Sequence, residues 1–242
     1  MKTRNIPLLA ALAAAMLLSG CETLGFGKKN NDDEIIPTVT KKKADYGQAY
    51  KDYVELGAQY LQMGRYDLAE PKLQRAIEID SRPPEAWNIL AVLYEEKRDI
   101  ASGNQIYQKL IHSHPEYLLG YTNYATFLCK FDRDSEMQAL LGQMRGRNAE
   151  FKTAASIAEG NCMERRGQSG AAENAYKQAI AANPQAEGAL LPLAQIALQK
   201  GDYAGALRYL RVVHTYVGYS PESVKLGIEA ARKSGDTRME EE

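Results

Sequence analysis

The stretch from Trp87 to Pro115 carries two helical patterns of hydrophobic residues, separated by a polar turn at residues 97–99. In the first pattern, large and small apolar side chains recur at i, i+3, i+4 and i+7, which places them on one helix face: Trp87, Leu90, Ala91 and Tyr94. In the second, one face carries Ile100, Gly103, Tyr107, Leu110 and Ile111. Pro115 ends this pattern, because proline disfavours helical backbone at the residue before it. The stretch therefore predicts a helix, a short turn and a second helix.

This helix–turn–helix unit repeats with a period of about 34 residues. Its first large position recurs as Tyr53, Trp87, Tyr121, Ser156, Leu190 and Val224. Four residues later the first five units have a small residue, and the sixth does not: Gly57, Ala91, Ala125, Gly160, Ala194 and Ile228. The turns hold Gly64, Gly167, Gly201 and Gly235. Small residues let the two helices of a unit approach closely. Because one helix pair cannot bury its faces alone, neighbouring units are expected to stack into a solenoid.

These positions resemble the tetratricopeptide repeat. The resemblance implies an all-α fold, a right-handed superhelical solenoid of about six units. Five units are complete, over about Tyr50–Tyr216, and the sixth is truncated. An ordinary helical bundle is the alternative, but it would not require a sustained period. Unit three departs most from the pattern, since Asp132 and Asp134 replace the glycine and the aromatic residue of its turn.

The N-terminus predicts a signal peptide over residues 1–20. Lys2 and Arg4 precede an apolar run at residues 6–18, which is too short for a normal membrane span. The run ends in Leu-Ser-Gly-Cys at residues 18–21, which resembles a bacterial lipoprotein signal. The alternative is a plain secretory signal in which Cys21 is incidental.

The lipoprotein resemblance implies that the peptide bond before Cys21 is cut and that its thiol carries a diacylglycerol thioether. The new α-amine would be acylated, so the chain would meet the membrane through a lipid anchor. Glu22 follows where many inner-membrane lipoproteins have aspartate, which by analogy favours the periplasmic face of the outer membrane. Residues 21–44 are polar, lack apolar periodicity and predict a flexible tether. Residues 45–242 then form the solenoid.

The charge balance and the absence of catalytic motifs argue against several classes of function. The 242 residues include 30 Lys or Arg and 31 Asp or Glu, and there is no basic stripe, so we expect no nucleic-acid partner. The His112/His114 pair lacks further metal ligands nearby and suits a helix C-terminus. We find no nucleophile or phosphate-binding motif. We therefore expect no enzyme, no metal, no small-molecule substrate and no cofactor beyond the covalent acyl anchor. An enzyme would need convergent acid, base or metal residues in a groove.

Cys129 and Cys162 are the two cysteines left after the leader. They lie on the first helices of units three and four, which are neighbours in a stacked array. The envelope compartment permits disulfides, so we predict a bridge between them. The alternative is two buried thiols that act as small hydrophobic groups.

Binding is the natural role of a repeat stack, because the first helices line an extended surface. In units one and two the candidate groove positions are Val54, Ala58, Leu61, Asn88, Val92, Glu95 and Glu96. Later units offer Thr122, Thr126, Asn161, Arg165 and Gln195. An apolar strip beside acidic groups can accept an amphipathic helix or an extended segment. The alternative is that these residues are outer parts of the packing interface, because periodicity does not fix a rotation of a few tens of degrees.

The lipobox, tether and first unit together resemble the PilF/PilW lipoproteins of type IV pilus biogenesis. The resemblance is carried by YVELGAQYLQMGRYDLAEPKLQRAIEID at residues 53–80 and by NYATFLC at 123–129 with Cys162. It implies a non-enzymatic outer-membrane pilotin that binds the pilus secretin subunit and promotes its targeting or multimerisation, as pilus biogenesis and twitching motility require. A generic periplasmic scaffold lipoprotein that recruits envelope enzymes such as peptidoglycan hydrolases is the alternative. The identity of the partner separates the two.

Overall fold

The computed structural model describes residues 45–235. The predicted signal peptide, the lipid attachment at Cys21 and the tether lie outside the described residues, as do residues 236–242. Within the described range every regular element is a helix. The helices are α1 (Tyr46–Gln62), α2 (Tyr66–Ile79), α3 (Glu85–Glu96), α4 (Ile100–Ser113), α5 (Leu118–Lys130), α6 (Asp134–Arg145), α7 (Ala149–Arg165), α8 (Ser169–Ala182), α9 (Glu187–Gln199), α10 (Tyr203–Tyr216) and α11 (Pro221–Ser234). The prediction of an all-α repeat fold is confirmed.

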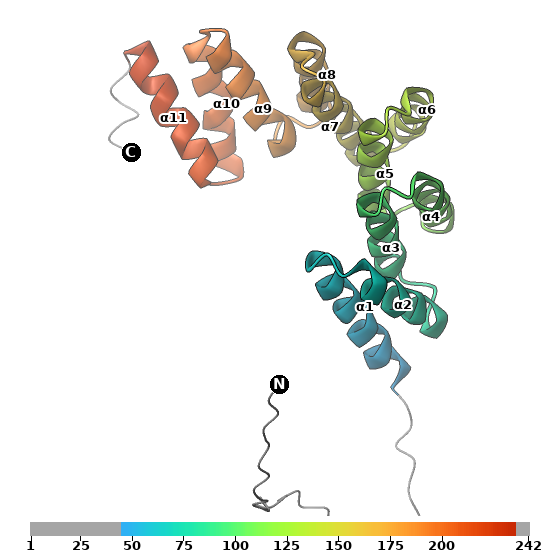
Figure 1. Cartoon of the computed structure of the whole chain (residues 1–242). Coiled ribbons are helices and arrows are strands. Elements are labelled where there is room, and N and C mark those ends of the chain that lie inside the picture. Colours follow the sequence, from blue (N-terminus) through green and yellow to red (C-terminus); the bar gives the residue numbers. More distant parts are fainter. Residues whose placement is uncertain (1–44, 236–242) are drawn as a thin grey trace, which may run out of the picture. The chain divides into compact units, whose positions relative to one another are not determined.

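The helices form five consecutive pairs, followed by α11 (Figure 1). Each odd-numbered helix up to α9 packs against the even-numbered helix after it and against the next odd-numbered helix. The even-numbered helices also contact the first helix of the following unit. Every unit thus buries its faces on its neighbours, as expected for a helical repeat array. None of the helices in residues 45–235 is long and apolar enough to cross a membrane.

The turn inside each unit uses left-handed backbone at one fixed position. Gly64, Gly167 and Gly201 have φ of 69°, 71° and 77° there. Units two and three keep the same turn with Arg98 at φ 56° and Asp132 at φ 54°. A side chain in this region costs roughly 1–2 kcal/mol relative to right-handed helix. Unit three therefore retains the repeat geometry although its sequence departs from the pattern.

The small residues on the first helices permit close contact with large side chains of the second helices. A Cβ placed on Gly57 would lie 2.7 Å from atoms of Leu73 on α2. A Cβ placed on Gly160 would lie 2.4 Å from Cε1 of Tyr176 on α8. Both distances are shorter than carbon atoms tolerate, so the bare glycines set the spacing within units one and four.

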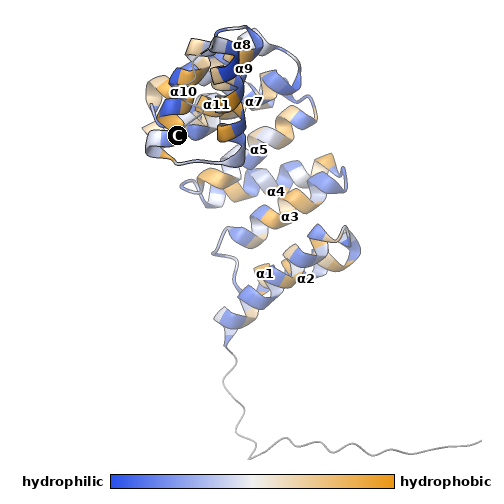
Figure 2. Cartoon of the chain, turned by 90° about the vertical axis from the view of Figure 1, so that its left-hand side faces the viewer, coloured by the Kyte–Doolittle hydropathy of each residue, from blue (hydrophilic) through white to orange (hydrophobic). Residues whose placement is uncertain are grey.

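The largest hydrophobic cluster of the described residues lies in the middle of the array and is rich in aromatic rings. Its buried members come from α3 to α7: Trp87, Ala91, Tyr107, Leu110, Tyr121, Tyr124, Ala125, Phe127, Leu128, Cys129, Met137, Leu140, Leu141, Met144, Phe151, Ala155 and Cys162. We call it the central core. Hydrophilic residues share these helices with hydrophobic ones, as expected for amphipathic helices (Figure 2).

Unit six differs because no second helix follows α11 in the described residues. Val224 and Ile228 occupy the repeat positions that Trp87 and Ala91 fill in unit two. Both are 38% exposed, whereas Trp87 and Ala91 are buried. The array therefore presents an open apolar edge on α11 within the described range.

Candidate partner-binding surface

The predicted groove residues of unit one lie on α1 at the edge of the packing interface. Val54, Ala58 and Leu61 are all half-buried. Leu61 packs against the cluster that contains Leu73, and Val54 packs against the cluster that contains Tyr50. Their outer atoms remain accessible, so contact of a partner with this strip stays a prediction.

The predicted groove residues of unit two differ among themselves. Val92 is half-buried, whereas Asn88 is 8% exposed and Glu95 is 9% exposed. The side-chain oxygen of Asn88 accepts a hydrogen bond from the amide nitrogen of Asn123 on α5, at 2.9 Å. The structure therefore places Asn88 and Glu95 in the packing interface, which was the alternative interpretation of the pattern.

Glu95 links three helices through its carboxylate. The ammonium group of Lys130 on α5 donates to Oε1 of Glu95 at 3.0 Å, and the hydroxyl of Tyr107 on α4 donates to Oε2 at 3.3 Å. Burial lowers the pKa of Lys130, but Glu95 and Glu96 outweigh it and raise that pKa above the usual value. Burial and the nearby Glu95 charge also raise the pKa of Tyr107. Glu95 is thus a paired structural charge.

Cys129 on α5 and Cys162 on α7 are both buried. In the structure their sulfur atoms lie 1.99 Å apart and their Cα atoms 5.8 Å apart, which is within the range that a disulfide spans. The arrangement brings together the two cysteines that the sequence paired. Their oxidation in the cell stays a prediction.

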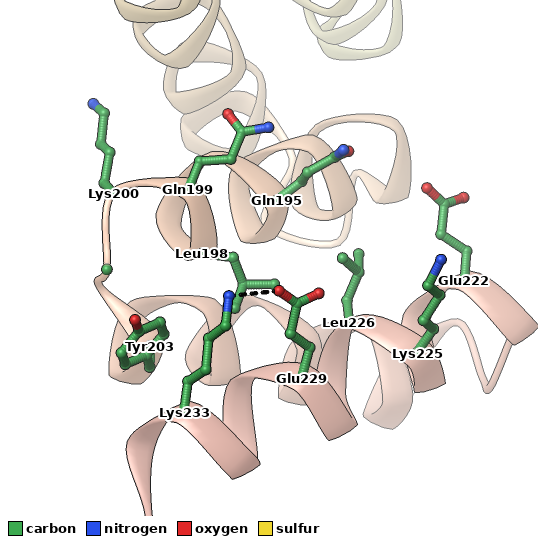
Figure 3. Close-up of a pocket in the computed structure, with 11 residues that line it drawn as sticks. Gln195, Leu198, Gln199, Lys200, Tyr203, Glu222, Lys225, Leu226, Glu229 and Lys233 are labelled. Atoms are coloured by element: carbon green, nitrogen blue, oxygen red, sulfur yellow. Dashed lines mark hydrogen bonds and ion pairs between the residues drawn. The ribbon is translucent and has the colours of Figure 1, made fainter.

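Two adjoining hollows lie between the odd-numbered helices at the C-terminal end. The larger, of about 700 Å³, lies between α9 and α11 (Figure 3). The smaller, of about 420 Å³, is lined by Glu164 of α7, by residues of α9 and by Glu222 of α11. Gln195 and Glu222 line both, so the hollows form one groove. We call it the C-terminal groove.

Sequence reasoning found only part of this groove. Gln195 is among the candidate groove positions of the later units, whereas Glu164, Glu187 and Glu222 are not. The available signal was their place on the first helices of units four to six. Periodicity identifies such positions but does not show where adjacent helices leave space between them.

In the larger hollow, charged side chains of α11 point toward α9 (Figure 3). The ammonium of Lys233 lies 2.8 Å from Oε1 of Glu229. This hydrogen-bonded ion pair holds the pKa of Glu229 below its usual range and raises that of Lys233. Leu198 and Leu226 supply apolar surface between the charges. The groove can therefore contact both polar and apolar parts of a polypeptide.

One pair of groups has the composition of a nucleophile and its base. Nε2 of His214 lies 3.1 Å from the hydroxyl oxygen of Ser223, and burial lowers the pKa of His214. The Ser223 side chain is buried, and its hydroxyl oxygen accepts a hydrogen bond from the backbone N–H of Ser220 in the capping box of α11. The same hydroxyl donates to the carbonyl oxygen of Ser220. This serine serves the helix N-terminus.

The histidine pair predicted to suit a helix end lies at the end of α4. His112 is exposed on the helix, and His114 is its buried C-cap. Among residues 45–235 no group of three or more His, Cys, Asp or Glu side chains could hold a metal ion.

Comparisons with known proteins agree with the repeat architecture. The Tetratricopeptide repeat family model matches residues 54–117 and 163–214. The type IV pilus assembly protein PilF of Pseudomonas aeruginosa is 26% identical over 226 residues, which cover 90% of this chain and 83% of that protein.

Two solved structures share the fold. PilF of Pseudomonas aeruginosa has a TM-score of 0.54 at 22% identity, covering 81% of this chain and 89% of its own. PilW, a widely conserved type IV pilus biogenesis factor, has a TM-score of 0.52 at 22% identity, covering 79% and 89%. The chain therefore has a tetratricopeptide-repeat fold and is similar to the PilF and PilW pilus proteins.

Proposed function

We propose that this chain is an outer-membrane lipoprotein that binds the secretin subunit of the type IV pilus and promotes its targeting or multimerisation. The observation that carries the proposal is the sequence similarity to PilF, a type IV pilus assembly protein, along 90% of this chain. The lipobox at Cys21 supports attachment to a membrane on the periplasmic side. The role is stoichiometric, because the chain acts by contact and not by turnover.

The repeat array suits this role physically. Its odd-numbered helices present a long surface on which a partner polypeptide can lie, and the even-numbered helices hold these first helices in register. The exposed polar and apolar groups of the C-terminal groove supply contacts of both kinds. A subunit held in this way would be kept from premature association until it reaches the outer membrane.

The test is the state of the pilus secretin in cells that lack this gene. We expect heat-resistant secretin multimers to disappear while the monomer remains, or to accumulate in the inner membrane. Expression of the wild-type chain should restore outer-membrane multimers, and a Cys21→Ala chain should restore fewer, because it lacks the anchor. Normal multimers in the outer membrane of the deletion strain would overturn the proposal in favour of a scaffold for other envelope proteins.

A further inference from the structure

The C-terminal groove has an acidic end, where three exposed glutamates form no direct ion pair in the described range. Glu164, Glu187 and Glu222 line the smaller hollow, and no lysine or arginine lines it. Glu164 accepts a hydrogen bond from the hydroxyl of Tyr176 at 2.8 Å, a neutral donor. Within residues 45–235, Glu187 and Glu222 form no direct ion pair. Three carboxylates around one hollow create a negative local potential, which attracts a positively charged ligand.

The opposite end of the groove carries lysines that are mostly compensated. Lys233 is paired with Glu229, and Lys200 is paired with Glu173 of α8. Lys225 also lines the larger hollow and forms no direct ion pair in the described range, but its side chain projects from α11 beside Glu222, next to the acidic end (Figure 3). The largest uncompensated charge of the groove is therefore negative, at the end formed by α7 and α9.

Apolar surface lies next to these carboxylates. Leu191 and Pro192 are half-buried on α9 and line the smaller hollow. Leu226 of α11 is half-buried and lines the larger one. A ligand that places a cation among the glutamates would thus meet apolar surface on both sides. Volumes of about 420 and 700 Å³ lie in the range of ordinary binding pockets and suit a few side chains.

From this juxtaposition we propose that the C-terminal groove binds a short segment of the partner polypeptide in which an arginine or lysine lies beside apolar residues. The basic side chain enters the smaller hollow among Glu164, Glu187 and Glu222. The apolar neighbours cover Leu191 and Leu226, and Lys225 contacts a carboxylate or carbonyl oxygen of the segment. The inference rests on the proposed function, because the partner it describes is the pilus secretin subunit.

The test uses the full chain and purified secretin subunit, with affinity measured at low and physiological salt. We expect Glu187→Lys and Glu222→Lys each to weaken binding by about fivefold to tenfold at low salt, with a smaller difference at higher salt. Glu150→Lys is the matched control. Glu150, Glu187 and Glu222 all lie in the first turn of a helix, so each reversal loses the same helix-dipole interaction. Only Glu150 lies outside the groove lining, and its variant should bind like wild type.

A charge exchange separates recognition from damage to the fold. Synthetic peptides tiled across the secretin subunit would locate the bound segment, and a peptide with its basic residue changed to glutamate should lose affinity for the wild-type chain. The same peptide should regain affinity for the Glu187→Lys variant. Glu187→Gln and Glu222→Gln remove the charge with little change in shape, so weaker binding by these variants at an unchanged thermal midpoint supports the proposal.

The outcomes are distinguishable. If wild-type chain does not bind the secretin subunit, the proposed function fails. If it binds and neither the lysine nor the glutamine variants differ from Glu150→Lys, the groove inference fails while the proposed function stands. If the variants alter self-association of the chain and leave secretin binding unchanged, the groove holds a second copy and the inference is also overturned.

Discussion

The central core and the C-terminal end pack the same repeat with different side chains. In the centre, the rings of Tyr107, Tyr124, Phe127 and Phe131 form a continuous chain, with centroid separations of 4.9–6.2 Å. At the C-terminal end, the cluster that joins α9, α10 and α11 consists mainly of alanine and leucine: Ala197, Leu198, Ala206, Leu207 and Ala230. Larger rings bury more apolar area, so stabilisation is concentrated in the centre.

Exposed apolar side chains and hollows are instead most frequent at the C-terminal end of the described residues. Of the nine exposed large hydrophobic residues in the described range, five lie on α10, α11 and the turn between them, namely Tyr216, Val217, Tyr219, Val224 and Ile228. The other four are Tyr46, Met63, Ile100 and Leu119. Both described hollows also lie at the C-terminal end. In a repeat array each unit interacts only with its neighbours, so one part can be braced while another keeps accessible surface. In this chain the large buried rings are therefore concentrated in the central core, and the described hollows lie at the C-terminal end.

The largest loss of stability is expected when a ring is removed from the middle of the chain of packed aromatic side chains. Phe127→Ala removes a fully buried ring that contacts Tyr107 and Phe131, and we expect about 3–5 kcal/mol of lost unfolding free energy. Leu207→Ala at the C-terminal end should cost about 2–3 kcal/mol. Urea denaturation of each variant and of the wild-type chain measures these losses of unfolding free energy.

Amide hydrogen exchange identifies the helices that each substitution destabilises. Phe127→Ala should speed amide exchange across α3 to α7, because one cluster spans those helices. Leu207→Ala should speed it only in α9 to α11. Faster amide exchange across the same helices in both variants would contradict the separation of the two regions.

Cys129 and Cys162 belong to the central core, so their removal also tests how stable that region is. If the bridge forms in the cell, Cys129→Ala with Cys162→Ala should lower the free energy of unfolding by about 3–4 kcal/mol on the chain-entropy account. Thiol labelling of the denatured wild-type chain, with and without prior reduction, counts the bridged cysteines. Unchanged labelling and an unchanged urea midpoint would leave the pair as buried thiols.

The repeat period predicted the array well because it depends on residues that recur in every unit. Small positions such as Gly160 and large partners such as Tyr176 set helix spacing wherever they occur, so they mark the helix pairs directly. The turn at Asp132 has the same left-handed conformation as the four other turns within units, so packing of α5 against α6 maintains the geometry without the expected glycine.

The candidate binding surface was harder to predict than the fold. Asn88 and Glu95 lie only a small rotation away from the exposed side of α3, and the polar partners that bury them, Asn123 and Lys130, come from the next unit. A period cannot show such a rotation. The C-terminal groove depends on the space left between α7, α9 and α11, which results from side-chain packing along all three helices.

A methyl group added at the close contact of unit four should have an intermediate effect. Gly160→Ala places Cβ against the buried ring of Tyr176, and we expect a loss of about 1–3 kcal/mol. Gly142→Ala is the matched control. A Cβ there meets nothing within 4 Å, so on α6 it should add about 0.5–1 kcal/mol. Thermal midpoints of the two variants should move in opposite directions; a rise for Gly160→Ala would show that α7 and α8 can separate at no cost.

The smallest effect concerns the ion pairs of Glu173 on α8, one with Lys177 on the same helix and one with Lys200 at the C-cap of α9. Lys177 and Lys200 hold the pKa of Glu173 below its usual range, and burial only partly offsets them. A lowered carboxyl pKa stabilises the fold above the unfolded-state pKa, and this contribution is lost as the pH falls through the folded-state value. Glu173→Gln should therefore reduce stability by up to about 1 kcal/mol at pH 7. Urea midpoints of variant and wild type should converge toward pH 3, whereas Glu116→Gln, in an exposed loop with no direct ion pair in residues 45–235, should show almost no difference at pH 7. A gap for Glu173→Gln that stays constant with pH would mean that this carboxylate acts through packing, and that the C-terminal end is braced at α8 by contacts other than charge.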